Sequence, residues 1–125
     1  MAGTWTAVTD RDGYVAGAYK QPRGLGYECT ADAAAATIPD LTLTKLSGWL
    51  CAIDVLFDAT TAVDSLTITP KTIDGVDMVT AATVLTATGR IVFSPPIPFA
   101  GGLIIDPGAT NTVNSGKAKF YILVQ

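Results

Sequence analysis

The chain has 125 residues, of which 49% are hydrophobic and 15% are charged, and its formal net charge is −3 at pH 7. This length fits one domain, and the charged fraction lies below the roughly 25% of an average soluble domain. The eight basic residues are scattered, which argues against nucleic acid, and no apolar run approaches the ~18 residues of a membrane-spanning helix. We therefore expect the apolar excess to cover a partner surface, in an oligomer or a larger assembly.

Residues 1–40 are predicted to be an N-terminal arm or the first strands of the domain. Five of the twelve glycines fall among the first 26 positions, interleaved with aromatic residues. Short strands are expected at 4–9 and 13–20, between these glycines. The alanine-rich stretch 30–37 fits a turn of helix or an extended linker equally well.

A β-sandwich domain is predicted over residues 41–125. Leu41 and Leu43 alternate with threonines, and the apolar strand 49–57 is expected to be central because both of its faces are apolar. One face of that strand is predicted to carry Trp49, Cys51, Ile53, Val55 and Phe57. Asp54, on the other face, is interpreted either as solvent-facing or as a carboxylate paired with Lys or Arg at a subunit interface.

The second half of the chain continues the strand pattern. Pro70 is expected to end the strand of Leu66 and Ile68 or to mark a sheet edge, and Asp74-Gly75 predicts a hairpin turn. Further strands are predicted at 78–85, 90–93, 103–105 and 117–124, with an extended segment that cannot form a ladder at Pro95, Pro96 and Pro98. Seven or eight short strands without an amphipathic helix predict an all-β fold, an antiparallel β-sandwich or jelly roll.

Reactive side chains are scarce. The sequence has no histidine, the usual general base, and no Gly-x-Ser-x-Gly motif, so we expect no enzyme and no catalytic residue. Two cysteines are too few for a zinc site without histidine, and the aspartates that bracket loops 54–64 and 74–77 lack EF-hand spacing. We interpret these aspartates as turn residues and expect no metal and no cofactor.

The two cysteines, Cys29 and Cys51, are expected to be free and buried rather than disulfide-bonded. The start Met-Ala-Gly-Thr-Trp has neither the charged nor the apolar region of a signal peptide, so an oxidising compartment is not expected.

Three segments resemble a small β-sandwich module of tailed-phage structural proteins. They are the apolar strand with an acidic turn at 50–58, the strand leading into a proline-containing segment at 89–99, and the Gly-Leu strand at 101–105 followed by the terminal strand at 120–124. The similarity covers roughly 60% of the chain and leaves residues 1–48 unmatched, and fold patterns alone are weak evidence of function.

The resemblance implies a virion protein of the capsid decoration, or cement, kind. Such a protein is a non-enzymatic structural subunit on the outer capsid surface, made in the host cytoplasm, which binds the major capsid protein lattice and stabilises the head. The implied state is a homotrimer, with no nucleic acid or membrane partner.

The predicted partner-binding residues lie in the N-terminal segment: Trp5, Tyr14, Tyr19, Arg23 and Tyr27. Glycine-spaced aromatic residues suit an arm that wraps a neighbouring subunit. Deletion of residues 1–27 is accordingly predicted to abolish capsid binding and leave the sandwich folded. Two alternatives stay open: a tail or head-fibre module that binds a host surface glycan, and a cellular carbohydrate-binding or adhesion module, which predicts a secretion signal.

Overall fold

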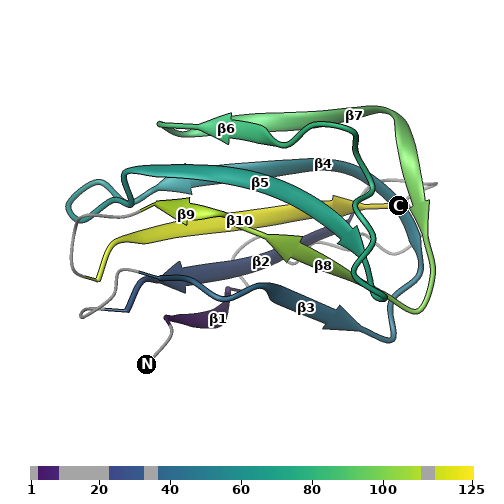
Figure 1. The fold of residues 1–125 in the computed structure, drawn as a ribbon, viewed down its shortest axis with the longest axis horizontal. Helices are drawn as coiled ribbons and strands as arrows, with labels where there is room; N and C mark the ends of the chain where they lie inside the picture. The colour runs from purple at the N-terminus through teal and green to yellow at the C-terminus, as the bar shows by residue number, and fades with distance from the viewer. Residues whose placement is uncertain (1–2, 9–22, 33–36, 111–114) are drawn as a thin grey trace.

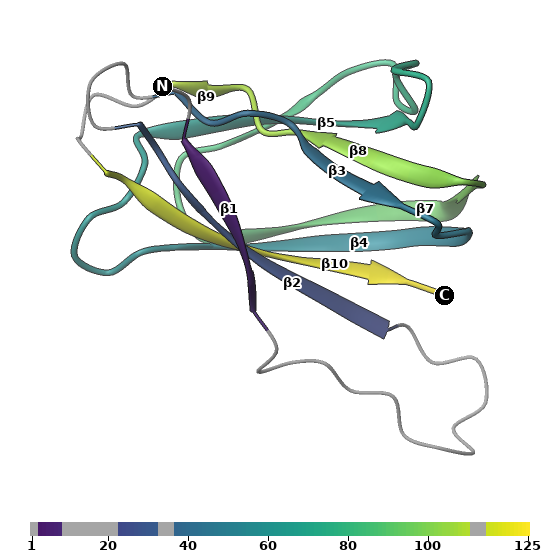
Figure 2. The ribbon, with the colours of Figure 1, turned by 90° about the horizontal axis from the view of Figure 1, so that it is seen from below.

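The computed structural model describes residues 3–8, 23–32, 37–110 and 115–125. In these residues the fold is all-β, with two antiparallel sheets that face each other (Figures 1 and 2). The first sheet has the order β1 (Thr4–Val8), β2 (Arg23–Thr30), β10 (Lys117–Val124), β4 (Gly48–Phe57) and β7 (Gly89–Phe99). The second has the order β3 (Leu41–Thr44), β8 (Gly102–Asp106), β5 (Ser65–Thr72) and β6 (Thr83–Leu85), with β9 (Ala109–Thr110) also pairing with β5.

This architecture confirms the all-β prediction and is consistent with a β-sandwich, whereas a jelly roll is not confirmed. Among the described residues, no helix is long and apolar enough to cross a membrane.

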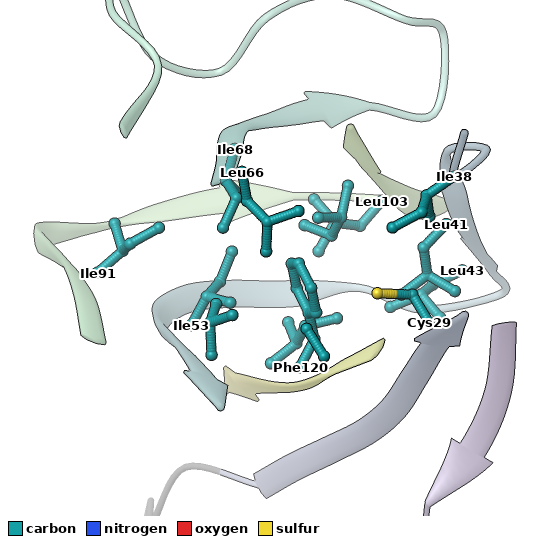
Figure 3. Close-up of a cluster of buried hydrophobic side chains, with 14 of the residues drawn as sticks. Cys29, Ile38, Leu41, Leu43, Ile53, Leu66, Ile68, Ile91, Leu103 and Phe120 are labelled. Atoms are coloured by element: carbon teal, nitrogen blue, oxygen red, sulfur yellow. The ribbon is translucent and has the colours of Figure 1, made fainter. Parts of the chain in front are cut away.

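The core lies between the two sheets and is filled by alternating residues of their inner strands (Figure 3). On β10, Phe120, Ile122 and Val124 all point inward, as their spacing predicted, and Phe120 is fully buried. Leu66 and Leu103 face them from β5 and β8 of the second sheet. Period-two alternation places one side chain in two on the core face, which is why these strands are clear in the sequence.

The N-terminal segment contributes strands of the first sheet, and an extended arm is not confirmed. β2 lies between β1 and β10 and pairs with β10 over its whole length. The predicted strand at 13–20 and the alanine run 33–36 lie outside the described residues. Deletion of residues 1–27 would remove β1 and most of β2, which exposes one side of β10, so that deletion does not separate binding from folding.

A β-bulge corrects the predicted faces of β4. The strand is an interior one, as expected, between β10 and β7, but its register with β10 shifts, so that Leu50 and Ala52 lie opposite the adjacent residues Val124 and Leu123. Because a bulge inserts one extra residue, the alternation changes phase there. Leu50 therefore points into the core with Ile53, while Trp49 lies on the outer face and is half exposed.

Pro70 does not end its strand, and the segment with Pro95, Pro96 and Pro98, which was expected to form no ladder, lies within β7. Pro70 lies inside β5, buried opposite Ile105 of β8, at a position beyond the end of the β6 pairing. β7 continues through its proline-rich part, and Pro98 pairs with Trp49. Prolines are tolerated there because β7 is the last strand of its sheet, and the N–H groups on its open side have no partner strand among the described residues. The strand predicted at 78–85 is shorter, because only Thr83–Leu85 pairs with β5.

Candidate interaction surface

Two of the predicted partner-binding residues, Trp5 and Tyr27, are half-buried and pack against the core. The Trp5 ring meets the ring of Phe120 edge to face, with centroids 5.1 Å apart, and its Nε1 donates to the backbone oxygen of Pro39 at 2.7 Å. These contacts give Trp5 a structural role in holding β1 to the sandwich.

The other three predicted residues are not brought together with this pair in the described structure. Arg23 is the first residue of β2, opposite Val124 of β10. Tyr14 and Tyr19 lie outside the described residues.

A different aromatic residue, Trp49, belongs to an exposed apolar area on the outer face of the first sheet. Trp49 is 50% exposed and Val92 is 64% exposed. The register sets Trp49 opposite Pro98, and Ala52 opposite both Val92 and Leu123. We call these five residues, of which Ala52 is itself buried, the Trp49 surface. Sequence periodicity did not reveal this surface, because the bulge places Trp49 on the face opposite to that of Ile53.

A salt bridge borders the Trp49 surface. Asp54 of β4 lies opposite Arg90 of β7, whose Nη2 donates to Oδ2 at 2.8 Å while its Nε donates to Oδ1. The Asp54 side chain is 14% exposed and the Arg90 side chain is 58% exposed. Asp54 is thus paired with an arginine of its own chain rather than, as one sequence interpretation had it, across a subunit interface. Two parallel hydrogen bonds fix the arginine beside the apolar residues.

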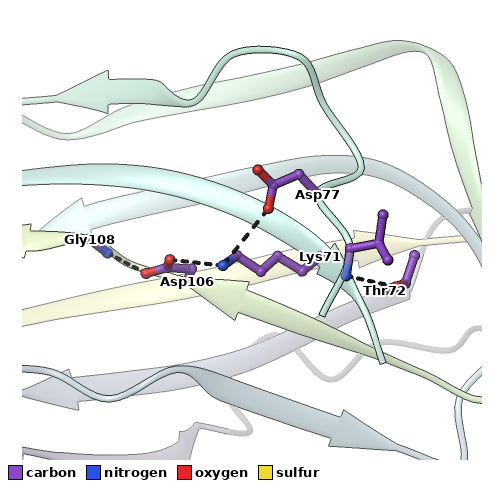
Figure 4. A network of polar contacts seen from close by, with 6 residues as sticks. Lys71, Thr72, Asp77, Asp106 and Gly108 are labelled. Carbon is purple, nitrogen blue, oxygen red and sulfur yellow. Dashed lines mark hydrogen bonds and ion pairs between the residues drawn. The ribbon is translucent and has the colours of Figure 1, made fainter. Parts of the chain in front are cut away.

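The second sheet carries a polar network on its outer face (Figure 4). Lys71 Nζ lies 3.4 Å from Asp106 Oδ2 and 3.8 Å from Asp77 Oδ1. Partial burial and the neighbouring Asp106 carboxylate raise the pKa of Asp40, and Lys71 opposes this rise. The network connects β5, β8 and the residue just before β3 through side chains that are partly exposed, so its contribution is sensitive to pH and salt.

Asp58 closes the turn after β4. Its Oδ2 accepts hydrogen bonds from the backbone N–H groups of Thr61 at 2.8 Å and Thr60 at 3.0 Å. These donors lower the pKa of Asp58. This geometry agrees with the interpretation of the loop aspartates as turn residues.

Both cysteines are free thiols, separated by β10 in the first sheet. Burial raises the pKa of the Cys29 thiol to about 12, which keeps it protonated and unreactive. Cys51, at the bulge of β4, is half-buried, and this partial burial raises its pKa as well. Neither thiol has the lowered pKa that a nucleophile or metal ligand needs.

A groove opens between β2 and β3, at the side of the sandwich that holds β1. Its volume is about 390 Å³, and Leu25 and Tyr27 line it from one sheet while residues 42–46 line it from the other. Among the described residues, no group of three or more Cys, Asp or Glu side chains is arranged to hold a metal ion.

Comparison with protein-family models, with curated proteins and with solved structures finds no match for this chain.

Proposed function

We propose that this chain is a non-enzymatic virion structural protein, a capsid decoration subunit that binds the major capsid protein lattice and stabilises the head. The observation that supports this proposal best is the Trp49 surface, an exposed apolar area on an interior strand of a sandwich. Tryptophan is enriched among the residues that dominate protein–protein binding energy. An apolar centre with Arg90 and Asp54 at its border has the composition of a protein interface.

The proposed mechanism is desolvation of the Trp49 surface against the shell. Burial of apolar area contributes roughly 25 cal/mol per Å² before the entropy of association is subtracted. A rigid strand with its side chains already placed lowers that entropic cost. Subunits seated between adjacent capsomers would bind both, and the second contact would gain from the high effective concentration.

Co-sedimentation with capsid shells of the virus that encodes the chain tests the proposal. The wild-type chain should pellet with the shells and raise their unfolding temperature, and Trp49→Ala should weaken binding by about tenfold or more, as for an interface hot spot. Val84→Ala, at a residue 61% exposed on β6 of the other sheet, is the matched control and should bind as wild type. Equal binding of all three proteins, or no binding of the wild type, would reject the assignment.

The exposed indole also favours the second candidate, a tail or head-fibre module that binds a host glycan. Exposed tryptophan rings offer an apolar body with one polar N–H. For that function, a panel of mono- and oligosaccharides should raise the melting temperature of the wild type but not of Trp49→Ala. If no sugar raises the melting temperature and the chain binds shells, the glycan-binding function is rejected and the decoration assignment is kept.

A further inference from the structure

The two end strands of the first sheet differ in how their open sides are protected. Proteins protect such edges with prolines, charges or bulges, because unpaired N–H and C=O groups recruit another strand. β7 contains Pro95, Pro96 and Pro98. β1, with the sequence TWTAV, contains neither a proline nor a charged residue. Among the described residues, no strand pairs with the outer side of β1.

From this contrast we propose that β1 pairs with β1 of a second copy of this chain, antiparallel and centred on Thr6, so that the two first sheets join across a two-fold axis. Only an extended backbone satisfies the open groups of a strand edge. A contact of the same strand with itself closes after two copies. This inference concerns self-association and does not rest on the proposed capsid function.

The side chains of β1 suit this pairing. Trp5 and Ala7 share the inner face, and centring on Thr6 sets each Trp5 opposite the Ala7 of the second copy, a large residue against a small one. Thr4 is set opposite Val8, and Thr6 opposite Thr6, on the outer face. No charge opposes a like charge in this register.

Within the described residues, the inner face at this edge is also incompletely covered. Ala7 is exposed although it points toward the second sheet, and Trp5 is only half-buried. β1 ends at Val8, opposite Gly26, so Leu25 has no β1 residue beside it, and the groove between β2 and β3 opens there. A second copy on β1 extends the covering layer over this part of the core.

The neighbouring end strand of the second sheet is a poorer pairing site. β3 has four residues, and charged residues, Asp40 and Lys45, flank it at both ends. A short strand with charged flanks is one of the ways in which proteins prevent edge pairing. This difference assigns the contact to β1.

Light scattering with size-exclusion chromatography, from micromolar to submillimolar protein, tests the proposal. The wild type should reach twice the 12.9-kDa chain mass. Thr6→Lys places two ammonium groups opposite each other at the two-fold axis and should raise the dimer dissociation constant by about tenfold or more. Thr6 is exposed and lies opposite Glu28 in the β1–β2 pair, so the monomer accommodates a lysine there.

Two further samples keep the result interpretable. An equimolar mixture of Thr6→Lys with a Thr6→Glu variant that also carries Glu28→Gln, so that no like charge lies opposite the new carboxylate, should recover the dimer because opposite charges then meet at the axis. Val84→Lys, on β6 at the other side of the molecule, should leave the wild-type mass unchanged. A wild type that is monomeric or trimeric throughout, a Thr6→Lys variant that dimerises as wild type does, or a mixture that stays monomeric would each overturn the pairing.

Discussion

The two sides of the first sheet arrange similar residue types differently. On the β1 side, Trp5 is turned inward against Phe120 and the backbone edge is left open. On the β7 side, prolines close the edge and Trp49 is turned outward on the neighbouring strand. Each side thus offers one kind of contact, backbone pairing at β1 and an apolar surface beside β7. The face of the strand on which a tryptophan lies, rather than its residue type, therefore decides whether it packs against the core or forms a contact surface.

Replacing one glycine on each side of the sheet by alanine should give the largest difference in stability. A Cβ at Gly26 of β2 would lie 2.4 Å from the backbone oxygen of Val8 and 3.1 Å from the Tyr121 ring. Gly26→Ala should therefore lower the free energy of unfolding by about 2–3 kcal/mol, at the upper end for overpacking. Gly89→Ala, at the start of β7, meets the end of the flexible Leu85 side chain at 3.3 Å and the Ala87 backbone oxygen at an ordinary 3.7 Å, and should change little. Urea unfolding compares the two, and equal losses would contradict the packing of β1 on β2.

The two tryptophans form the next pair. Trp5→Ala removes a half-buried ring and its hydrogen bond to Pro39 and should cost about 2 kcal/mol, less than for a fully buried tryptophan. Trp49→Ala removes a half-exposed ring and should change stability by about 0.5 kcal/mol or less, as at other surface sites. Thermal unfolding distinguishes them. A Trp49 variant less stable than the Trp5 variant would show that the inner and outer faces are wrongly assigned.

The carboxyl groups of Asp40 and Asp58 should change the stability of the protein in opposite directions as pH rises. Asp40 has a raised folded-state pKa, so its contribution to stability is present below its usual value of 3.8 and is lost as pH rises through the folded value. Asp58 has a lowered one, so its contribution is present above 3.8 and is lost as pH falls through the folded value. Denaturant titrations between acidic and neutral pH should show that Asp40→Asn raises stability at pH 7 while Asp58→Asn lowers it. The same sign for both variants would refute these assignments.

The smallest expected difference is in the reactivity of the two cysteine thiols. Cys29 of β2 is fully buried with a pKa of about 12, and Cys51 of β4 is half-buried. In the native state at pH 8, an alkylating reagent should label Cys51 slowly and Cys29 only after unfolding. Mass spectrometry after proteolysis locates the label. Labelling of native Cys29 at the rate of Cys51 would mean that β2 opens readily.

The pattern of apolar residues predicted most of the strands that carry the core. β10 and β4 were found because apolar residues recur along them, and the turn at Asp74-Gly75 follows from local backbone preference, with Gly75 at φ 87°. β2 was missed because its glycines suggest a loop. Gly26 is instead required by the close approach of the Val8 backbone oxygen and the Tyr121 ring, long-range contacts that the local pattern does not contain.

The interaction surface was less predictable than the fold. The N-terminal aromatic residues were selected by type and spacing, yet Trp5 and Tyr27 pack against the core. Trp49 was placed on the same face as Ile53 because strict alternation has no means of anticipating the bulge after Leu50. A one-residue change of phase exchanges the two faces of a strand, and so it also exchanges structural and surface roles.

Hydrogen exchange of the backbone amides at both ends of the first sheet, measured as a function of protein concentration, tests the contrast between the two sides most directly. We predict that protection of the β1 amides rises with concentration, because the outer amides become hydrogen-bonded in the paired state. Protection of the β7 amides should stay constant. Concentration-independent exchange of β1, or protection that rises at β7 instead, would contradict the account.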